Sequence, residues 1–140
     1  MAPFRSRPLA RAAAALLVLA GLVGAALAAG LHGSPYGRVA EELLARLHAE
    51  PVACPVGLDD AVVCFVVDPA RVAPCAEAIE AYVAEHGGAL TIGPWSSGNG
   101  AYQVTIAHHD DLAGGLEVWL AETGTSRVEG RLEHVPRRRD

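Results

Sequence analysis

Two segments near the carboxyl end of the chain alternate between apolar and polar residues, and this pattern limits the fold more than any other feature. They are residues 116–121 and 127–133, and Gly124 between them suits a turn. Successive side chains of a strand point to opposite faces, so each segment is expected to form a strand with one apolar and one polar face. The pattern predicts a hairpin in an antiparallel sheet that has one buried face and one solvent-facing face.

One register of this hairpin suits both faces. Pairing Leu120 with Val128 gathers the apolar side chains on one face and brings Glu117 opposite Arg131 on the other. Trp119 then lies on the polar face, where it is expected to be exposed. An indole in such a place marks a contact surface for a ligand or a partner in many proteins, although a single exposed apolar residue needs no functional explanation.

The other elements follow from periodicity and turn signals. Two segments carry apolar residues at helical spacing, and these helices are expected to end at Pro51 and at Gly87. The expected helices are 37–49 and 74–86, the other expected strands are 52–56, 61–67, 90–93 and 101–108, and residues 94–100 are expected to form a loop. The chain is therefore predicted to be an α+β protein, a two-layer sandwich with two helices packed on one face of a mostly antiparallel sheet of about five or six strands.

The amino end has the three zones of a secretory signal peptide. Arginines precede an apolar run from Ala12 to Ala25, and Ala26-Leu27-Ala28 then offers small residues where signal peptidase needs them. The alternative is an uncleaved anchor, whose basic end stays in the cytoplasm, so in both cases the domain lies outside the cytoplasm, secreted or periplasmic. The predicted organisation is a signal peptide at 1–28, a linker at 29–36, one domain at 37–135 and a basic tail at 136–140.

The charge and composition of the chain exclude some partners. Without the three arginines of the signal segment, the chain has twice as many acidic as basic residues, whereas nucleic-acid binding relies on clustered cations. Nucleic acid is therefore not an expected partner, and contact with a membrane is expected only through an uncleaved anchor. Every basic residue is an arginine, which together with the high alanine and glycine content suggests a GC-rich bacterial genome.

Three cysteines bear on redox chemistry in an exported chain, because close pairs oxidise outside the cytoplasm. A hairpin of residues 52–56 and 61–67 places Cys54 opposite Cys64, within bridging distance, and the alternative is a bridge from Cys54 to Cys75. The first pairing leaves Cys75 as a free thiol near a helix N-terminus. Such a position favours a reactive thiol, but the apolar neighbours of Cys75 favour a small buried residue, which is the interpretation we prefer.

Histidines end two of the predicted strands. The hairpin register brings His108 and His134 to the same end of the sheet, where His109 and Glu133 also lie. Imidazole and carboxylate suit zinc, yet the spacing matches no zinc signature, and adjacent residues of a strand point to opposite faces. His108 and His134 are therefore weak metal candidates, and neither a metal site nor a cofactor is predicted.

The sequence contains no nucleophile elbow, phosphate-binding loop or other catalytic motif. Catalysis is therefore not expected, and we interpret the chain as an exported, non-catalytic module that binds a protein or a small ligand. Two alternatives are a metal- or thiol-dependent accessory enzyme and a purely structural domain that forms a homodimer through an edge strand. The candidate residues of the binding face are Trp119, Trp95, Tyr102, Glu117 and Arg131.

Overall fold

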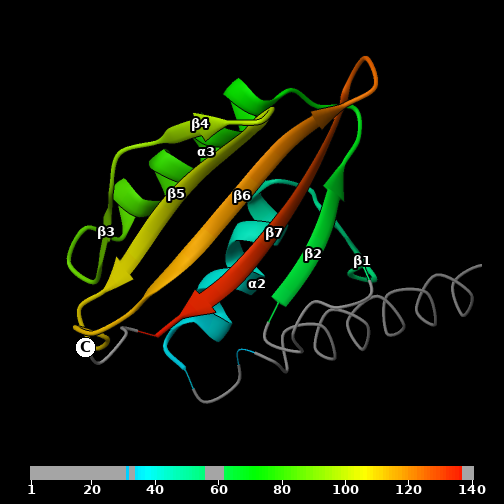
Figure 1. Cartoon of the computed structure of the whole chain (residues 1–140). Coiled ribbons are helices and arrows are strands. Elements are labelled where there is room, and N and C mark those ends of the chain that lie inside the picture. Colours follow the sequence, from blue (N-terminus) through cyan, green and yellow to red (C-terminus); the bar gives the residue numbers. More distant parts are fainter. Residues whose placement is uncertain (1–30, 32–33, 56–61, 137–140) are drawn as a thin grey trace, which may run out of the picture.

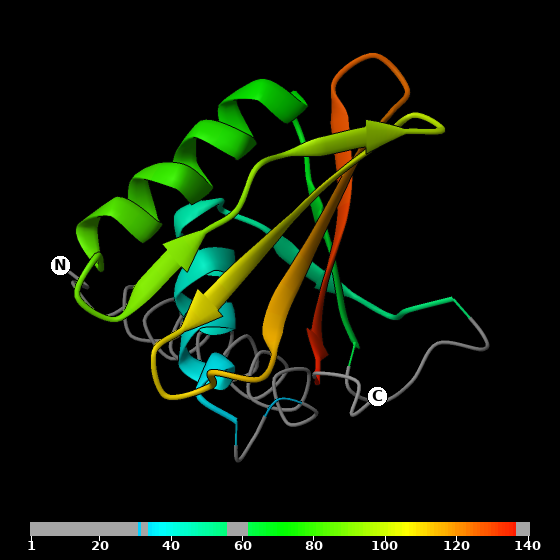
Figure 2. The same ribbon diagram turned by 60° about the vertical axis from the view of Figure 1, so that its left-hand side comes forward.

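Two α-helices and one antiparallel sheet make up the part of the chain that the computed structural model describes, which is residue 31, residues 34–55 and residues 62–136. The elements are α2 (Tyr36–Arg46), β1 (Glu50–Val52), β2 (Val62–Val67), α3 (Val72–Glu85), β3 (Leu90–Ile92), β4 (Ser96–Gly98), β5 (Ala101–His108), β6 (Gly115–Thr123) and β7 (Arg127–Val135). Both helices lie on the same face of the sheet (Figures 1 and 2). The predicted α+β two-layer sandwich is confirmed, whereas the predicted signal segment and most of the predicted basic tail lie outside the described residues.

The sheet has seven strands in the order β1-β2-β7-β6-β5-β3, and β4 pairs separately with β5. The strand β4 was not expected, because it lies within the predicted loop 94–100 and its Ser-Ser-Gly sequence has no β-branched or aromatic residue. Asn99 and Gly100 join β4 to β5, and both have positive φ (55° and 77°). Two consecutive residues of this kind form the tight turn whose twist matches a hairpin.

The predicted hairpin of β6 and β7 is present, but its register differs from the prediction by two residues. Leu120 pairs with Gly130 and not with Val128. Because the side-chain period of a strand is two, this shift leaves every side chain on its predicted face and changes only its cross-strand partner. The turn accounts for the register, because Thr123 pairs with Arg127 and leaves a three-residue loop in which Gly124 has a positive φ of 66°. On the other side of β7, Gly130 pairs with Phe65 of β2, whose ring packs directly over it.

The apolar core lies between the helices and the facing side of the sheet. Its larger members are Tyr36, Val39, Leu43, Ile79, Val83, Val63, Phe65, Val104, Ile106, Leu116, Val118, Leu120 and Leu132. These residues come from both helices and from the four strands β2, β5, β6 and β7, so the helix-side face of the sheet is the dry one. The opposite face of the sheet is hereafter called the open face.

The ends of both helices differ by a few residues from the predicted ones. α2 ends at Arg46, before Pro51 is reached, because His48 adopts a positive φ of 51° that does not continue a helix. α3 begins at Val72, whose backbone N–H donates to the carboxylate of Glu122 on β6 at 3.0 Å. A carboxylate at this position stabilises the start of a helix. Within the described residues no helix is long and apolar enough to cross a membrane.

Candidate functional site

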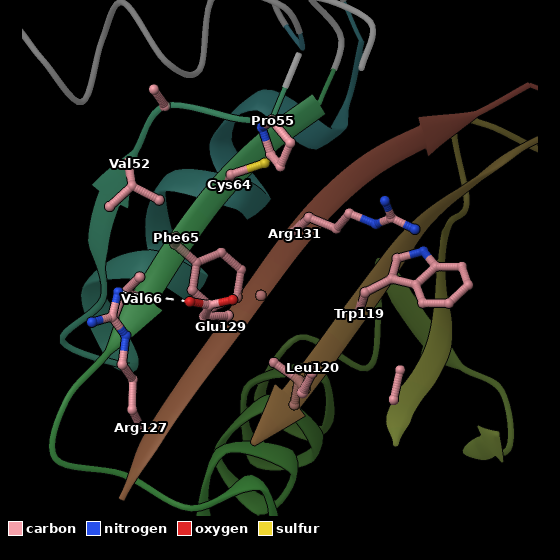
Figure 3. A pocket seen from close by; sticks show the side chains of 14 residues that line it. Val52, Pro55, Cys64, Phe65, Val66, Trp119, Leu120, Arg127, Glu129 and Arg131 are labelled. Atoms are coloured by element: carbon pink, nitrogen blue, oxygen red, sulfur yellow. Dashed lines mark ion pairs between the residues drawn. The ribbon is translucent and has the colours of Figure 1, made fainter. Parts of the chain in front are cut away.

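The open face carries Trp119 at its centre. The two-residue shift in register makes Arg131 of β7 its cross-strand neighbour on one side, and Gln103 of β5 is its neighbour on the other. Trp119 is half-buried, so the prediction of a fully exposed indole is corrected. The guanidinium of Arg131 covers part of its ring, with Cζ 4.5 Å from the ring centroid. Figure 3 shows the two side chains together on this face.

The charge of Arg131 is not paired with a carboxylate in the way the sequence predicts. Its expected partner, Glu117, lies opposite Glu133 in the observed register. Within the described residues Arg131 forms no salt bridge. Its guanidinium therefore keeps donors available for a further acceptor, while the contact with Trp119 contributes about 0.5–1 kcal/mol at a partly exposed site.

A hollow of about 480 Å³ opens on the open face beside Trp119 (Figure 3). Its apolar lining comes from β1, β2, β5 and β6 and from the segment after β1, and comprises Val52, Ala53, Pro55, Val66, Ala101 and Ala121. Trp119 and Arg131 form one wall, and Arg127 and Glu129, which form an ion pair at 3.7 Å, form another. This volume lies within the range of small-molecule sites, which combine apolar walls with a few polar groups.

The indole N–H of Trp119 is buried and has no hydrogen-bond partner in the described part of the chain. A buried donor that is left unpaired costs about 1–3 kcal/mol. Native structures pair most such groups, so an unpaired one requires a physical explanation. Together, Trp119 and Arg131 present donors that lack an acceptor at the wall of an apolar hollow.

Two carboxylates face each other next to this wall. Glu117 lies opposite Glu133, and this pair is two residues along the strands from the pair of Trp119 and Arg131. Burial raises the pKa of the Glu117 carboxyl, and the charge of Glu133 raises that pKa further, whereas the positive charge of Arg131 lowers it. The ionised form of Glu117 is thus disfavoured in the folded protein.

Replacing Glu117 by glutamine is expected to raise the free energy of unfolding at neutral pH by about 0.5 kcal/mol, because like charges directly across a sheet repel. The raised pKa means that the folded state binds a proton more tightly than the unfolded state does, so the wild type gains stability as the pH falls through the raised pKa. Glu117→Gln should lose this gain, and urea denaturation at several pH values measures it. Glu77→Gln, on the exposed side of α3, is the control and should keep the wild-type pH profile.

Trp95 and Tyr102 do not lie on the open face with the other three candidate residues. Trp95 packs against the core on the helix side, and its indole N–H donates to Glu80 of α3 at 2.8 Å. Tyr102 pairs with Leu120, so it lies on the helix-side face, where it is 42% exposed near the end of β5. The alternation of β5 was the available signal, because it groups Tyr102 with the buried residues of that strand.

The structure joins Cys54 and Cys64 in a disulfide, with a distance of 5.2 Å between their Cα atoms. The geometry of the hairpin differs from the prediction, because β1 covers Glu50–Val52 and Val52, not Cys54, lies opposite Cys64. Cys54 follows the end of β1. A disulfide fits an extracytoplasmic protein, because the cytoplasm keeps thiols reduced.

Cys75 is the free cysteine of the described residues, and it is buried in the first turn of α3. Burial raises the pKa of its thiol, which opposes the activation expected at a helix N-terminus. The thiol is therefore held in its unreactive, protonated form. This arrangement supports the buried interpretation of Cys75 over a catalytic one.

Iodoacetamide is expected to leave Cys75 unmodified in the folded protein, because alkylation requires an accessible thiolate. Denaturation without a reductant should then allow one alkylation, and denaturation with a reductant should allow three, as the disulfide opens. Intact mass spectrometry counts the added groups. Rapid labelling of the native protein would contradict the burial of this thiol.

The two predicted metal candidates have separate partners. Tyr36 of α2 contacts both rings, with its centroid 6.2 Å from that of His108 and 5.2 Å from that of His134. The hydroxyl of Tyr36 accepts the backbone N–H of His108 at 2.9 Å, and Nε2 of His134 lies 3.1 Å from a carboxylate oxygen of Asp111. His108 and His134 therefore do not form a metal pair, and the partner of His108 is His109, whose ring stacks on it.

A second hollow, of about 370 Å³, lies where the two helices meet the end of β5. Glu42, Tyr82 and His86 line it, and the Tyr82 hydroxyl donates to the Glu42 carboxylate at 2.6 Å. Burial and this carboxylate raise the pKa of Tyr82. Sequence reasoning missed the hollow, because it placed Glu42 on a solvated helix face. The only available signal was the spacing of Tyr82 and His86 on one side of α3.

Comparisons of the chain with protein families, curated proteins and solved structures gave no match. The class of protein is therefore defined by the structure alone, as a two-layer α+β sandwich with a hollow on its open face.

Proposed function

We propose that the protein is an exported, non-catalytic binding module whose ligand occupies the hollow on the open face. The observation that carries this proposal is the unpaired indole N–H of Trp119 beside the unpaired guanidinium of Arg131, at the wall of an apolar hollow. A ligand with an acceptor oxygen removes the cost of the unpaired donor, and its apolar part covers the apolar wall.

This chemistry defines the ligand class. Donors without an acceptor among the described residues suit a ligand that has a carboxylate or carbonyl oxygen, and the walls formed by alanine, valine and proline suit an apolar body. The neighbouring carboxylates of Glu117 and Glu129 disfavour a ligand with several negative charges. The expected ligand is therefore a small amphipathic molecule with a single acidic or carbonyl group.

Export rests on two independent supports. The first is the predicted signal segment at 1–28, and the second is the disulfide, which persists in an oxidising compartment. The intact mass of the protein from its native host tests export directly. Loss of the mass of residues 1–28 supports it, and a full-length chain with reduced cysteines contradicts it.

The ligand site can be tested by NMR with 2-naphthoate, which combines a planar apolar body with one carboxylate. The indole N–H signals of Trp95 and Trp119 act as reporters, because the first donates to Glu80 and the second has no partner among the residues that the structure describes. Saturable binding should move the Trp119 signal downfield as its N–H gains an acceptor, and it should leave the Trp95 signal in place. The variant Trp95→Phe assigns the two signals.

Variants of the wall distinguish this site from general adhesion of an apolar probe. Arg131→Gln should weaken 2-naphthoate binding about tenfold, because a hydrogen bond to a charged group contributes about 1.5–3 kcal/mol. The uncharged ketone 2-acetylnaphthalene should lose less affinity in the same variant. The proposal fails if the Trp119 signal does not respond, or if Trp95→Phe weakens binding as much as Arg131→Gln does.

A further inference from the structure

The turn after β5 gathers three side chains that ligate metals. His108 ends β5, and His109 and Asp110 follow it directly. One ligand atom from each of the three residues lies within 4.8 Å of the others. The rings of the two histidines stack at 4.7 Å between centroids, because the strand ends at His108 and the next residue no longer has to point to the opposite face.

The hydrogen bonds of His109 determine which of its nitrogens faces the cluster. Its Nδ1 lies 3.2 Å from the backbone carbonyl oxygen of Ala89, which can only accept, so Nδ1 carries the proton. In the neutral ring, Nε2 then presents a lone pair. That nitrogen lies 3.1 Å from Oδ1 of Asp110, which is also an acceptor. Two acceptors at this distance repel unless a proton or a metal cation is shared between them.

The first histidine adds a third acceptor. Nδ1 of His108 accepts the backbone N–H of Asp110 at 3.0 Å, so this nitrogen carries no proton, and it lies 3.8 Å from Oδ2 of Asp110. A metal ion at this nitrogen takes the place of that hydrogen bond, because the ring nitrogen has one lone pair. Two imidazole nitrogens and one carboxylate thus lie close together at this turn. From this arrangement we propose that His108, His109 and Asp110 bind a divalent transition-metal ion, most simply zinc.

The donor set selects the class of metal. Two nitrogens and one oxygen suit zinc, copper or nickel, whereas magnesium and calcium require oxygen ligands. Bonds of about 2.1 Å to a tetrahedral zinc ion separate its ligand atoms by roughly 3.4 Å. Nε2 of His109 lies 3.1 Å from Oδ1 of Asp110, and Nδ1 of His108 lies 3.8 Å from the other oxygen, Oδ2, so the side chains must shift slightly to bring one oxygen to this spacing from both nitrogens. Three protein ligands leave one position for water or another ligand.

The backbone already holds the turn in place. The Tyr36 hydroxyl accepts the N–H of His108, and the carbonyl of Ala89 accepts the N–H of His109 at 2.9 Å. The same carbonyl orients the His109 ring, as second partners orient metal-ligating histidines in known sites. His109 therefore needs little ordering on binding, whereas His108 gives up its hydrogen bond from the Asp110 N–H. The site lies at the other end of β5 from the hollow that Ala101 lines, and it does not depend on the proposed ligand-binding function.

Isothermal titration of the full chain with zinc chloride tests the site. We expect saturable binding at this turn, and Mg²⁺ in large excess should not compete. His109→Gln and Asp110→Asn should each weaken zinc binding at least about tenfold, because each removes one of three ligands. His48→Asn removes an exposed histidine after α2 and should bind as the wild type does. Zinc should also shift the NMR signals of the His109 ring nitrogens.

Each remaining outcome overturns the proposal. These outcomes are the absence of saturable zinc binding, unchanged affinity in both His109→Gln and Asp110→Asn, or equal loss of affinity in His48→Asn. Because His109 and Asp110 are exposed, their replacement should leave the thermal midpoint without metal unchanged. That measurement separates a lost ligand from a damaged fold.

Discussion

Replacing Gly130 by alanine is expected to lower the free energy of unfolding by about 3 kcal/mol. A Cβ atom at this position would lie 2.8 Å from Cε1 of Phe65 and closer still to Cζ and Cε2. The ring is only 1% exposed, between the sheet and the helices, so it has no free space into which it can move. Urea denaturation followed by circular dichroism measures the loss.

Two further variants make this prediction specific to the ring. Gly88→Ala adds the same methyl group where no atom lies within 4 Å and φ is ordinary, so it should change stability by less than about 0.5 kcal/mol. Combining Gly130→Ala with Phe65→Leu should cost less than the sum of the two single replacements, because the smaller side chain relieves the clash. A Gly130→Ala variant as stable as the wild type would contradict the packing described for β2 and β7.

Removing the disulfide by Cys54→Ala together with Cys64→Ala is expected to destabilise the domain by about 3 kcal/mol. The bridge closes a short loop, with a sequence separation of 10 residues, and the unfolded chain gains conformational freedom when it is opened. The midpoint of urea denaturation under oxidising conditions should fall accordingly.

A reductant provides the internal control for this experiment. Dithiothreitol should lower the midpoint of the wild type to about that of the double variant, and it should leave the double variant unchanged. Equal sensitivity of both proteins to dithiothreitol would show that the bridge does not contribute to stability.

The faces of the sheet could be predicted from the sequence, whereas the neighbours on each face could not. Alternation in β6 assigns Trp119 to the open face whatever the register, because all registers that keep the apolar residues together differ by an even number of residues. The cross-strand partner of Trp119 depends on the length of the turn after Thr123, which is three residues in the structure. The alternation within the two strands does not give that length.

The same limit applies to the candidate sites. The hollow on the open face combines residues from five strands and from the segment after β1, and its unpaired indole N–H is a property of packing. The proposed metal site depends on the carbonyl of Ala89, which lies in the connection between α3 and β3 and orients the His109 ring. The sequence places both histidines at a strand end, but only the hydrogen bonds show which nitrogen is available.

The outermost strands of the sheet bear on how the protein behaves at high concentration. Each of β1, β3 and β4 has three residues, and Pro51 at the centre of β1 has no N–H to donate. Within the described residues, a strand from another molecule therefore finds few free backbone groups along either edge. Edges this short resist the edge-to-edge growth that leads to fibrils. The domain is consequently expected to remain free of β-aggregation even at high concentration.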